Sequence, residues 1–368
     1  MFNERLRARL EELSSQNNRR YLPNISNGVD FWSNDYLGLA RDLPNSMQPS
    51  GGSTGSRLIS GNKEEYEQTE MIVAHYHKAA SALVFSSGYA ANVGLLSSIP
   101  SRHDVILYDS LIHASLRDGI RLSLARALPF RHNDLHHLRE RLRKVNGTCL
   151  VVTESVFSMD GDVAPLKDML SICQEFGAAM IVDEAHAIGV FGPQGSGKVT
   201  ELGLEDDIFA RIVTFGKALG VHGAAVLGSG DLVDYLINHA RSFIFSTGPS
   251  PHQWKSIREA YTLLEESYDI RRQALERNMG HLNTRLRDLP LGYFVVHTPI
   301  VPIKWPGNEA VIQLETVLQE AGLLVKGIRH PTVARGEERL RISLHAFNTI
   351  PEIDRLVETL QRSLPNEY

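Results

Sequence analysis

The stretch Met180-Ile-Val-Asp183-Glu-Ala-His186 joins three consecutive apolar residues to a group of ionisable ones. A strand that is apolar at successive positions is buried on both faces, as in a parallel sheet covered by helices. In such sheets, ligands bind at the carboxyl ends of the strands. The stretch therefore predicts a buried strand whose end presents Asp183 and His186 to a site.

Runs of the same kind occur on both sides of this strand, and helical stretches alternate with many of them. The further strand candidates are Ala82–Phe85, Val105–Leu107, Cys149–Thr153, Ile212–Thr214, Ala224–Leu227 and Phe243–Phe245. The alternation predicts an α/β domain on a large, mainly parallel, seven-stranded sheet. Polar clusters follow several runs, namely Ser86-Ser-Gly88, Asp109-Ser110, Glu154-Ser155 and Gly216-Lys217.

The pattern changes after about Pro251, where a long helical stretch begins and runs to Leu286. Strand-like runs and a closing helix follow, and Thr349 with Glu352 has the spacing of a capping box. The runs are Phe294–Val296, Val301–Ile303 and Leu340–Leu344. We predict three parts: an N-terminal helix and arm (1–35), a large α/β domain (36–250) and a small C-terminal α+β domain (251–368).

The composition is that of a globular protein, with 42% hydrophobic and 22% charged residues. A net charge of −5 does not fit nucleic-acid binding. The sequence contains no run of about 18 apolar residues, so we expect no membrane-spanning helix. Cys149 and Cys173 are the only cysteines in the sequence, so we expect neither a disulfide framework nor a cysteine metal site. This cysteine usage favours a cytoplasmic location.

Two patterns suggest other functions but lack a required feature. Gly192-Pro-Gln-Gly-Ser-Gly-Lys198 resembles a P-loop, but Val199 replaces the Ser or Thr that holds magnesium, which favours a tight turn. His132, His136 and His137 cluster without an HExxH motif, and we interpret them as a solvated helix face with no metal.

Lys217 lies just past a strand, between a glycine and small apolar residues. A confined position of this kind disfavours the charged amine and so lowers its pKa. A lysine that forms Schiff bases requires a neutral amine; the alternative is an ordinary surface lysine. Asp183 at a strand end suits a buried cation, such as the protonated pyridine nitrogen of pyridoxal phosphate (PLP), and His186 can reach the phenolate oxygen. Residues 88–92 open a helix whose N–H groups can hold a phosphate.

Six motifs occur in one order along most of the chain. They are Asn34-Asp-Tyr-Leu-Gly38, Ser86-Ser-Gly-Tyr-Ala-Ala-Asn92, His113-Ala-Ser115, Glu154-Ser-Val-Phe-Ser-Met-Asp-Gly-Asp162, Asp183-Glu-Ala-His186 and Thr214-Phe-Gly-Lys217. The order resembles the α-oxoamine synthases, PLP enzymes with the aspartate-aminotransferase fold (PLP fold type I). The resemblance extends from about Asn34 to Ile353.

The resemblance implies a role for each matching residue around the cofactor ring. Lys217 forms the Schiff base with PLP and later moves the Cα proton of the substrate. Asp183 pairs with the pyridine nitrogen and His186 with the phenolate oxygen. His113 stacks on the ring and Ser158 lies near its oxygen, although each of these two residues taken alone also suits a helix or turn cap.

The resemblance also implies the phosphate site. The backbone at Gly88 and Tyr89 and the hydroxyl of Thr214 hold the phosphate, although the glycine turn alone also suits a plain strand-to-helix connection. Thr247 reaches the phosphate from the other subunit, which implies a homodimer with shared active sites.

Four residues match substrate-binding positions of the family. Asn34 and Arg341 bind the amino-acid carboxylate, Arg341 with a bidentate fork, although an exposed edge charge is its alternative reading. Arg329 matches another arginine near the site. Arg20 contacts the acyl carboxylate or the coenzyme A phosphates, unless it is solvated.

The likeness is greatest to the family member that condenses L-alanine with a pimeloyl thioester in biotin synthesis and releases carbon dioxide. The thiol carrier is coenzyme A or an acyl carrier protein. Sister enzymes that use glycine or serine are the main alternative, followed by a plain aminotransferase or a non-catalytic scaffold.

Overall fold

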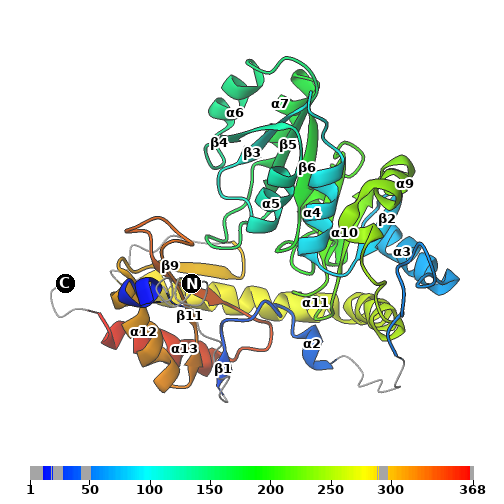
Figure 1. Cartoon of the computed structure of the whole chain (residues 1–368). Helices are drawn as coiled ribbons and strands as arrows, with labels where there is room; N and C mark the ends of the chain where they lie inside the picture. Colours follow the sequence, from blue (N-terminus) through cyan, green and yellow to red (C-terminus); the bar gives the residue numbers. More distant parts are fainter. Residues whose placement is uncertain are drawn as a thin grey trace. The chain divides into compact units, whose positions relative to one another are not determined.

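A computed structural model describes residues 11–17, 19, 28–42, 51–287, 289 and 297–364. The chain divides into two compact units, and Figure 1 shows the course of the chain through both. The larger unit holds residues 37–158 and 162–272, and the smaller one holds the described residues of 1–36, 159–161 and 273–368. Their division falls inside one long helix, α11 (Pro251–Arg287). The three-part division by sequence stays a prediction.

The larger unit contains a seven-stranded sheet, counted over the residues that the structure describes. Its strands, in spatial order, are β2 (Ser81–Phe85), β8 (Ala224–Gly228), β7 (Ala210–Thr214), β6 (Ala179–Asp183), β5 (Cys149–Glu154), β3 (Val105–Asp109) and β4 (Arg126–Phe130). β8 is antiparallel to both of its neighbours, and the other pairs are parallel. The predicted mainly parallel, seven-stranded sheet is confirmed.

Helices pack against this sheet, and Figure 1 shows α4 and α5 beside each other over its strands. The helices of the unit are α2 (Leu39–Asp42), α3 (Glu64–Tyr76), α4 (Gly88–Ser98), α5 (Ala114–Leu122), α6 (Leu135–Leu142), α7 (Leu166–Glu175), α8 (Lys198–Leu202), α9 (Gly230–His239), α10 (Arg241–Ile244) and the first part of α11. All six residues of β5 are buried, as expected for a strand covered on both faces.

The sequence analysis was wrong about one strand and missed another. Phe243–Phe245 is not a strand: residues 241–244 form the short helix α10, and the Phe243 ring packs on Phe85 with the ring centroids 5.6 Å apart. β4 escaped notice because it is an edge strand with an exposed Arg126 and a proline at position 129, and only Phe130 is buried.

The strand directions bring the predicted polar clusters to one edge of the sheet. β3, β5, β6 and β7 are mutually parallel, and β2 runs in the same direction because the antiparallel β8 lies between β2 and β7. Asp109, Glu154, Asp183 and Thr214 are therefore the last residues of adjacent or nearby strands at the same edge. The fold itself positions the candidate site there.

The smaller unit contains a three-stranded antiparallel sheet, in the order β11 (Lys326–Ile328), β12 (Arg339–Ser343) and β9 (Ile300–Lys304). β1 (Val29–Asp30) pairs in parallel with β10 (Leu323–Leu324), and the helices include the end of α11, α12 (Asn308–Glu320) and α13 (Ile350–Arg362). The predicted capping box of Thr349 and Glu352 is confirmed at the start of α13. Phe294–Val296 and most of the predicted N-terminal helix lie outside the described residues.

Two further expectations concern the cysteines and the membrane. Cys149 and Cys173 are both free and buried. Among the described residues, no helix combines the length and the apolar character that crossing a membrane requires.

Candidate active site

Lys217 and His186 face each other at the carboxyl edge of the sheet. Lys217 follows β7 and His186 follows β6, and the Lys217 Nζ atom lies 2.6 Å from the His186 Nε2 atom. At this distance one nitrogen must supply a lone pair to the other, so the two groups are not both protonated. The structure thus brings together the residue predicted to form the Schiff base and the residue predicted to contact the phenolate oxygen.

Asp183 is a buried carboxylate, 5% exposed, at the end of β6. Its Oδ1 atom accepts a hydrogen bond from the Ala185 backbone N–H (2.9 Å), and its Oδ2 atom accepts one from the Asn92 amide (2.8 Å). Within the described residues it has no ion-pair partner at salt-bridge distance. Two neutral donors orient this carboxylate and leave it suited to a cationic ligand group.

His113 is the N-cap residue of α5, which confirms the capping alternative. Only Nδ1 serves the cap, because it accepts from the Ser115 backbone N–H, while the residue as a whole stays exposed. Burial, followed by the charge of Lys217, lowers the pKa of the His113 imidazole against the opposing effect of Asp183. A neutral, accessible ring is compatible with stacking on a cofactor.

Gly88 and Tyr89 are the first two residues of α4, so their N–H groups have no partner within the helix. Gly88 lies close to the Thr214 hydroxyl: a Cβ at position 88 would be 2.6 Å from Thr214 Oγ1. Two backbone N–H groups, a hydroxyl and the positive end of a helix dipole are the donors that a phosphate dianion requires.

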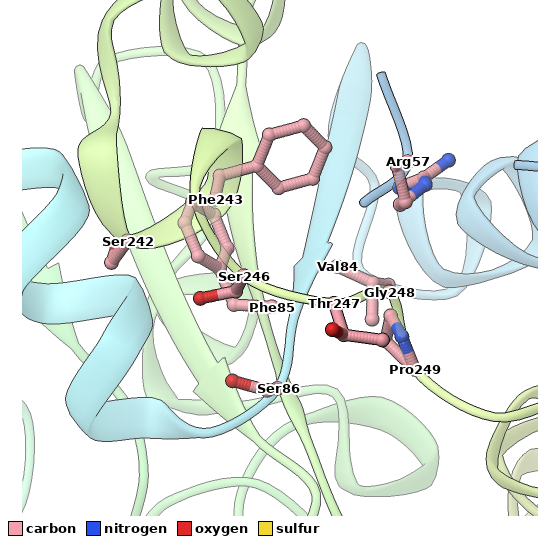
Figure 2. A pocket seen from close by; sticks show the side chains of 10 residues that line it. All are labelled: Arg57, Val84, Phe85, Ser86, Ser242, Phe243, Ser246, Thr247, Gly248 and Pro249. Atoms are coloured by element: carbon pink, nitrogen blue, oxygen red, sulfur yellow. The ribbon is translucent and has the colours of Figure 1, made fainter. Parts of the chain in front are cut away.

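Thr247 and Ser86 line a small pocket, shown in Figure 2, together with residues of the segment that follows α10. Thr247 is exposed and pairs with Ser56 in an antiparallel bridge. The chain therefore presents Thr247 on its surface near the start of the Ser86–Asn92 segment. Its predicted role toward a partner subunit stays a prediction.

Ser158 is half-buried and follows Phe157 in the turn between Val156 and Val163, which form an antiparallel bridge. The base of this turn is held by the Phe157 N–H, which donates to the Asp162 carbonyl at 3.0 Å. Ser158 thus lies in the turn that follows β5, the strand paired with β6, and its predicted role near the ring oxygen stays a prediction.

The predicted carboxylate-binding residues come together in the smaller unit. Arg341 donates to the Asn34 Oδ1 atom and to the Ser343 hydroxyl, both at 2.9 Å. Arg341 is 7% exposed and lies on the central strand β12, so it is not an exposed edge charge. Arg329 donates to the Asn17 carbonyl at 2.9 Å, and Arg20 lies outside the described residues.

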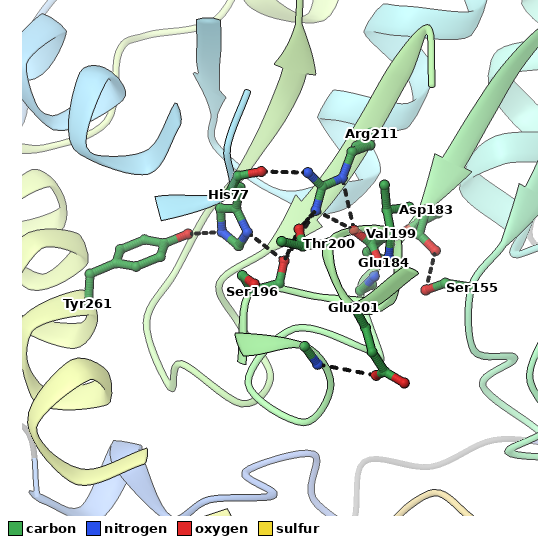
Figure 3. Close-up of polar contacts among 12 residues, drawn as sticks. His77, Ser155, Asp183, Glu184, Ser196, Val199, Thr200, Glu201, Arg211 and Tyr261 are labelled. Carbon is green, nitrogen blue, oxygen red and sulfur yellow. Dashed lines mark hydrogen bonds and ion pairs between the residues drawn. The ribbon is translucent and has the colours of Figure 1, made fainter. Parts of the chain in front are cut away.

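The acidic stretch and the glycine-rich segment behind it form one buried network, shown in Figure 3. Arg211 is 2% exposed and donates from Nε (2.9 Å) and Nη2 (2.6 Å) to the Glu184 Oε2 atom. The Glu184 Oε1 atom accepts from the Val199 N–H at 2.9 Å. A side chain at Gly197 would collide with this carboxylate, since its Cβ would lie 2.7 Å from Oε2. The P-loop-like segment is thus a turn, as predicted, and it folds around an ion pair that the sequence did not indicate.

The histidine cluster differs from the prediction. His132 precedes α6, and its ring bridges two carboxylates, with Nδ1 2.9 Å from Asp109 Oδ1 and Nε2 2.6 Å from Asp162 Oδ2. Burial alone would lower the pKa of His132, but the hydrogen bonds to these carboxylates raise it to about 9. His136 remains an exposed helix residue, and no group of potential metal ligands occurs among the described residues.

Comparison with known proteins shows the family of this chain. The model of the family "Aminotransferase class I and II" matches residues 26–360. The chain belongs to this family. It is 42% identical to 8-amino-7-oxononanoate synthase from Emericella nidulans (91% of this chain, 89% of the relative) and 40% identical to the enzyme of that name from Marinobacter nauticus (91% and 87%).

Solved structures of the family have the same fold. Serine palmitoyltransferase from S. paucimobilis, with a bound PLP–myriocin aldimine, has a TM-score of 0.87 at 26% identity. The match includes 97% of this chain and 96% of that structure's chain. The 8-amino-7-oxononanoate synthase from Francisella tularensis has a TM-score of 0.76 at 29% identity, with coverages of 91% and 97%. The predicted α-oxoamine synthase family and PLP fold type I are confirmed.

The sequence analysis gave no role to three residues that the structure places at the site. Glu154 is 3% exposed, accepts from the His113 backbone N–H at 2.5 Å, and pairs in register with Asp183. Burial, and then the charge of Asp183, raises the pKa of Glu154 to about 8. Asn92 and Ser115 are the last residues of two of the six motifs, and this position in the motifs is the sequence feature that could have identified them.

Breaking the Glu184–Arg211 pair should destabilise the larger unit. Arg211→Leu leaves the Glu184 carboxylate buried without its counter-charge, so we expect a loss of about 3–5 kcal/mol in the free energy of unfolding. Urea denaturation measures this loss. In the control variant Arg121→Ala, which loses an ion pair whose arginine side chain is 77% exposed, the loss should stay below about 1 kcal/mol. Equal losses in the two variants would contradict the prediction.

The His132 bridge should make stability depend on pH. The folded pKa of about 9 exceeds the ordinary value of 6.5, so the bridge contributes fully below pH 6.5 and its contribution disappears as the pH rises through 9. His132→Gln should therefore cost about 1–3 kcal/mol at pH 6 and much less above pH 9, measured by urea denaturation at each pH. The exposed His136→Gln should show no such pH-dependent difference.

Proposed function

We propose that this chain catalyses the PLP-dependent, decarboxylative condensation of L-alanine with a pimeloyl thioester. The products are 8-amino-7-oxononanoate, carbon dioxide and the free thiol carrier. The observation that carries the proposal is the buried Asp183 carboxylate without an ion-pair partner among the described residues, at the same sheet edge as the 2.6 Å contact between Lys217 and His186. Relatives about 40% identical over nine-tenths of the chain, named 8-amino-7-oxononanoate synthase, support the choice of substrates.

The residues at the sheet edge fit PLP. Lys217 would hold it covalently through Nζ, Asp183 would face its pyridine nitrogen, and the α4 N-terminus with Thr214 would hold its phosphate. When bound, PLP supplies an electron sink for negative charge that develops at the substrate Cα atom.

The side chains of the site then have separate tasks. Lys217 removes the proton from the Cα atom of L-alanine and returns one after carbon–carbon bond formation and loss of carbon dioxide. His186 lies 2.6 Å from the Lys217 amine and can share its proton at Nε2. Arg341, already held by Asn34 and Ser343, binds the carboxylate of the amino acid in the orientation that this step requires.

A second copy of the chain completes the site in this proposal. Thr247 is exposed and pairs with Ser56, and the segments of these two residues also carry the exposed side chains of Phe245 (70%) and Ile59 (86%). Large apolar side chains exposed together are typical of a surface that a partner covers. A homodimer would cover them and bring Thr247 to the phosphate of the other subunit.

A serine-using synthase is the second candidate, because serine palmitoyltransferase has the TM-score of 0.87 at 26% identity. The higher identity of the 8-amino-7-oxononanoate synthases favours L-alanine.

The near-visible absorption spectrum of the purified holoenzyme, titrated with amino acids, tests the function. We expect a PLP band that responds to L-alanine at a concentration at least about tenfold below that needed for glycine or L-serine, a difference of about 1.4 kcal/mol. Pimeloyl-coenzyme A or the pimeloyl carrier protein should then yield 8-amino-7-oxononanoate by mass spectrometry. A preference for serine would favour the second candidate, and the absence of a band after PLP addition would reject both.

Lys217→Ala should abolish turnover, because it removes both the covalent attachment and the base. We expect a loss of at least about 10³-fold in kcat, since general acid–base catalysis alone contributes about 10²–10⁴-fold and the covalent attachment is lost as well. Lys198→Ala, which removes a lysine paired with Glu201, is the control and should retain activity. Appreciable activity in Lys217→Ala would reject this assignment.

A further inference from the structure

A chain of hydrogen bonds links the imidazole of His113 to the carboxylate of Asp183. The His113 Nδ1 atom lies 2.7 Å from the Ser115 hydroxyl, which lies 2.9 Å from the Asn92 Nδ2 atom. The same Asn92 Nδ2 atom lies 2.8 Å from Asp183 Oδ2. Residues of α4 and α5 thereby connect two groups that belong to different elements of the sheet edge.

The direction of each hydrogen bond follows from the donors present. A carboxylate accepts only, so the Asn92 amide must turn its Nδ2 atom toward Asp183, and its second hydrogen then donates to Ser115 Oγ. Because Ser115 Oγ accepts from Asn92, its own hydrogen is available to His113 Nδ1. The Ser115 backbone N–H donates to that same nitrogen at 3.2 Å. Nδ1 is thus an acceptor, and the neutral His113 ring carries its proton on Nε2.

This arrangement is costly in terms of stability alone. Asn92 and Ser115 are 2% and 1% exposed, and the Asn92 Oδ1 atom is buried with no hydrogen-bond partner among the described residues. A buried, unsatisfied carbonyl costs free energy that an apolar side chain of similar size would not. Polar groups retained at such a cost are expected at functional sites.

We propose that Asn92 and Ser115 are positioning residues that hold the Asp183 carboxylate and the His113 ring in one fixed orientation toward PLP. The inference rests on the proposed function and deepens it. Glu154 also holds His113, since its carboxylate accepts a hydrogen bond from the His113 backbone N–H at 2.5 Å. We call the hydrogen bonds of Asn92 and Ser115 between His113 and Asp183 the bridge. Loss of the bridge leaves the substrate contacts proposed for Arg341 and Asn34 intact but lets the Asp183 carboxylate and the His113 ring reorient.

Three variants test the bridge: Asn92→Leu, Ser115→Ala and the double variant. In Asn92→Leu we expect kcat, and the rate of α-deuterium exchange of L-alanine in D₂O without thioester, to fall about 10- to 100-fold. KM for L-alanine should change less than about threefold, because binding is not the step affected. The visible circular dichroism of the bound PLP, which reports its orientation in the site, should change as well.

Ser115→Ala should have a smaller effect, because Asn92 still reaches Asp183. The double variant should resemble Asn92→Leu instead of showing the product of the two effects, since both substitutions interrupt one chain. Ser98→Ala is the matched control, because Ser98 lies on the same helix as Asn92. Among the described residues its hydroxyl donates only to carbonyls of that helix, at 2.7 Å to Gly94 and 3.4 Å to Leu95. Its exchange rate should equal that of the wild type.

The outcomes separate the bridge from the proposed function. Because the buried Asp183 carboxylate loses one donor, apo Asn92→Leu should melt at a lower temperature than the wild-type apoprotein. Its far-ultraviolet circular dichroism at the assay temperature should equal that of the wild-type apoprotein, so a loss of exchange would not reflect misfolding. A normal PLP band with unchanged exchange and circular dichroism in Asn92→Leu would overturn the bridge alone. Absence of a PLP band in the wild type would overturn the proposed function, and this inference with it.

Discussion

Burial of the Asp183 carboxylate is the constraint on which the site depends. A charge that is 5% exposed needs oriented donors, and the fold supplies them from the Ala185 backbone and from Asn92 on α4. Both donors are neutral, so the electrostatic demand of the carboxylate is met only in part. An unmet demand of this kind, at the carboxyl edge of a mainly parallel sheet, suits the cationic ligand group that the proposed function places there.

The neighbouring residue Glu184 has the opposite role, although it is adjacent in sequence. Its charge is fully paired with Arg211, and its second oxygen binds the backbone of the segment that starts α8. Successive strand residues point to opposite faces, so two acidic residues in a row serve two different environments. One carboxylate organises a turn behind the sheet edge, and the other remains available for chemistry.

Much of the site could be predicted because its residues follow apolar strands in a fixed order. Asp183, His186 and Lys217 were identified from that placement and from the resemblance to a family, and the structure brings them to one edge. Segments without a clear pattern were less predictable. β4 is an edge strand with polar residues, and Phe243 belongs to a short helix whose apolar spacing over a few residues also suits a strand.

His132, Asn92 and Ser115 illustrate what sequence order alone leaves open. Each forms its decisive contacts with residues that are distant in the chain: His132 with Asp109 and Asp162, and Asn92 with Ser115 and Asp183. The sequence by itself determined most of the strand pattern, the family and a set of candidate site residues, because these depend on local periodicity, motif order and residue type. Only the tertiary structure decided which polar side chains meet, since a hydrogen bond requires donor and acceptor within about 3 Å, a distance that the packing of elements sets.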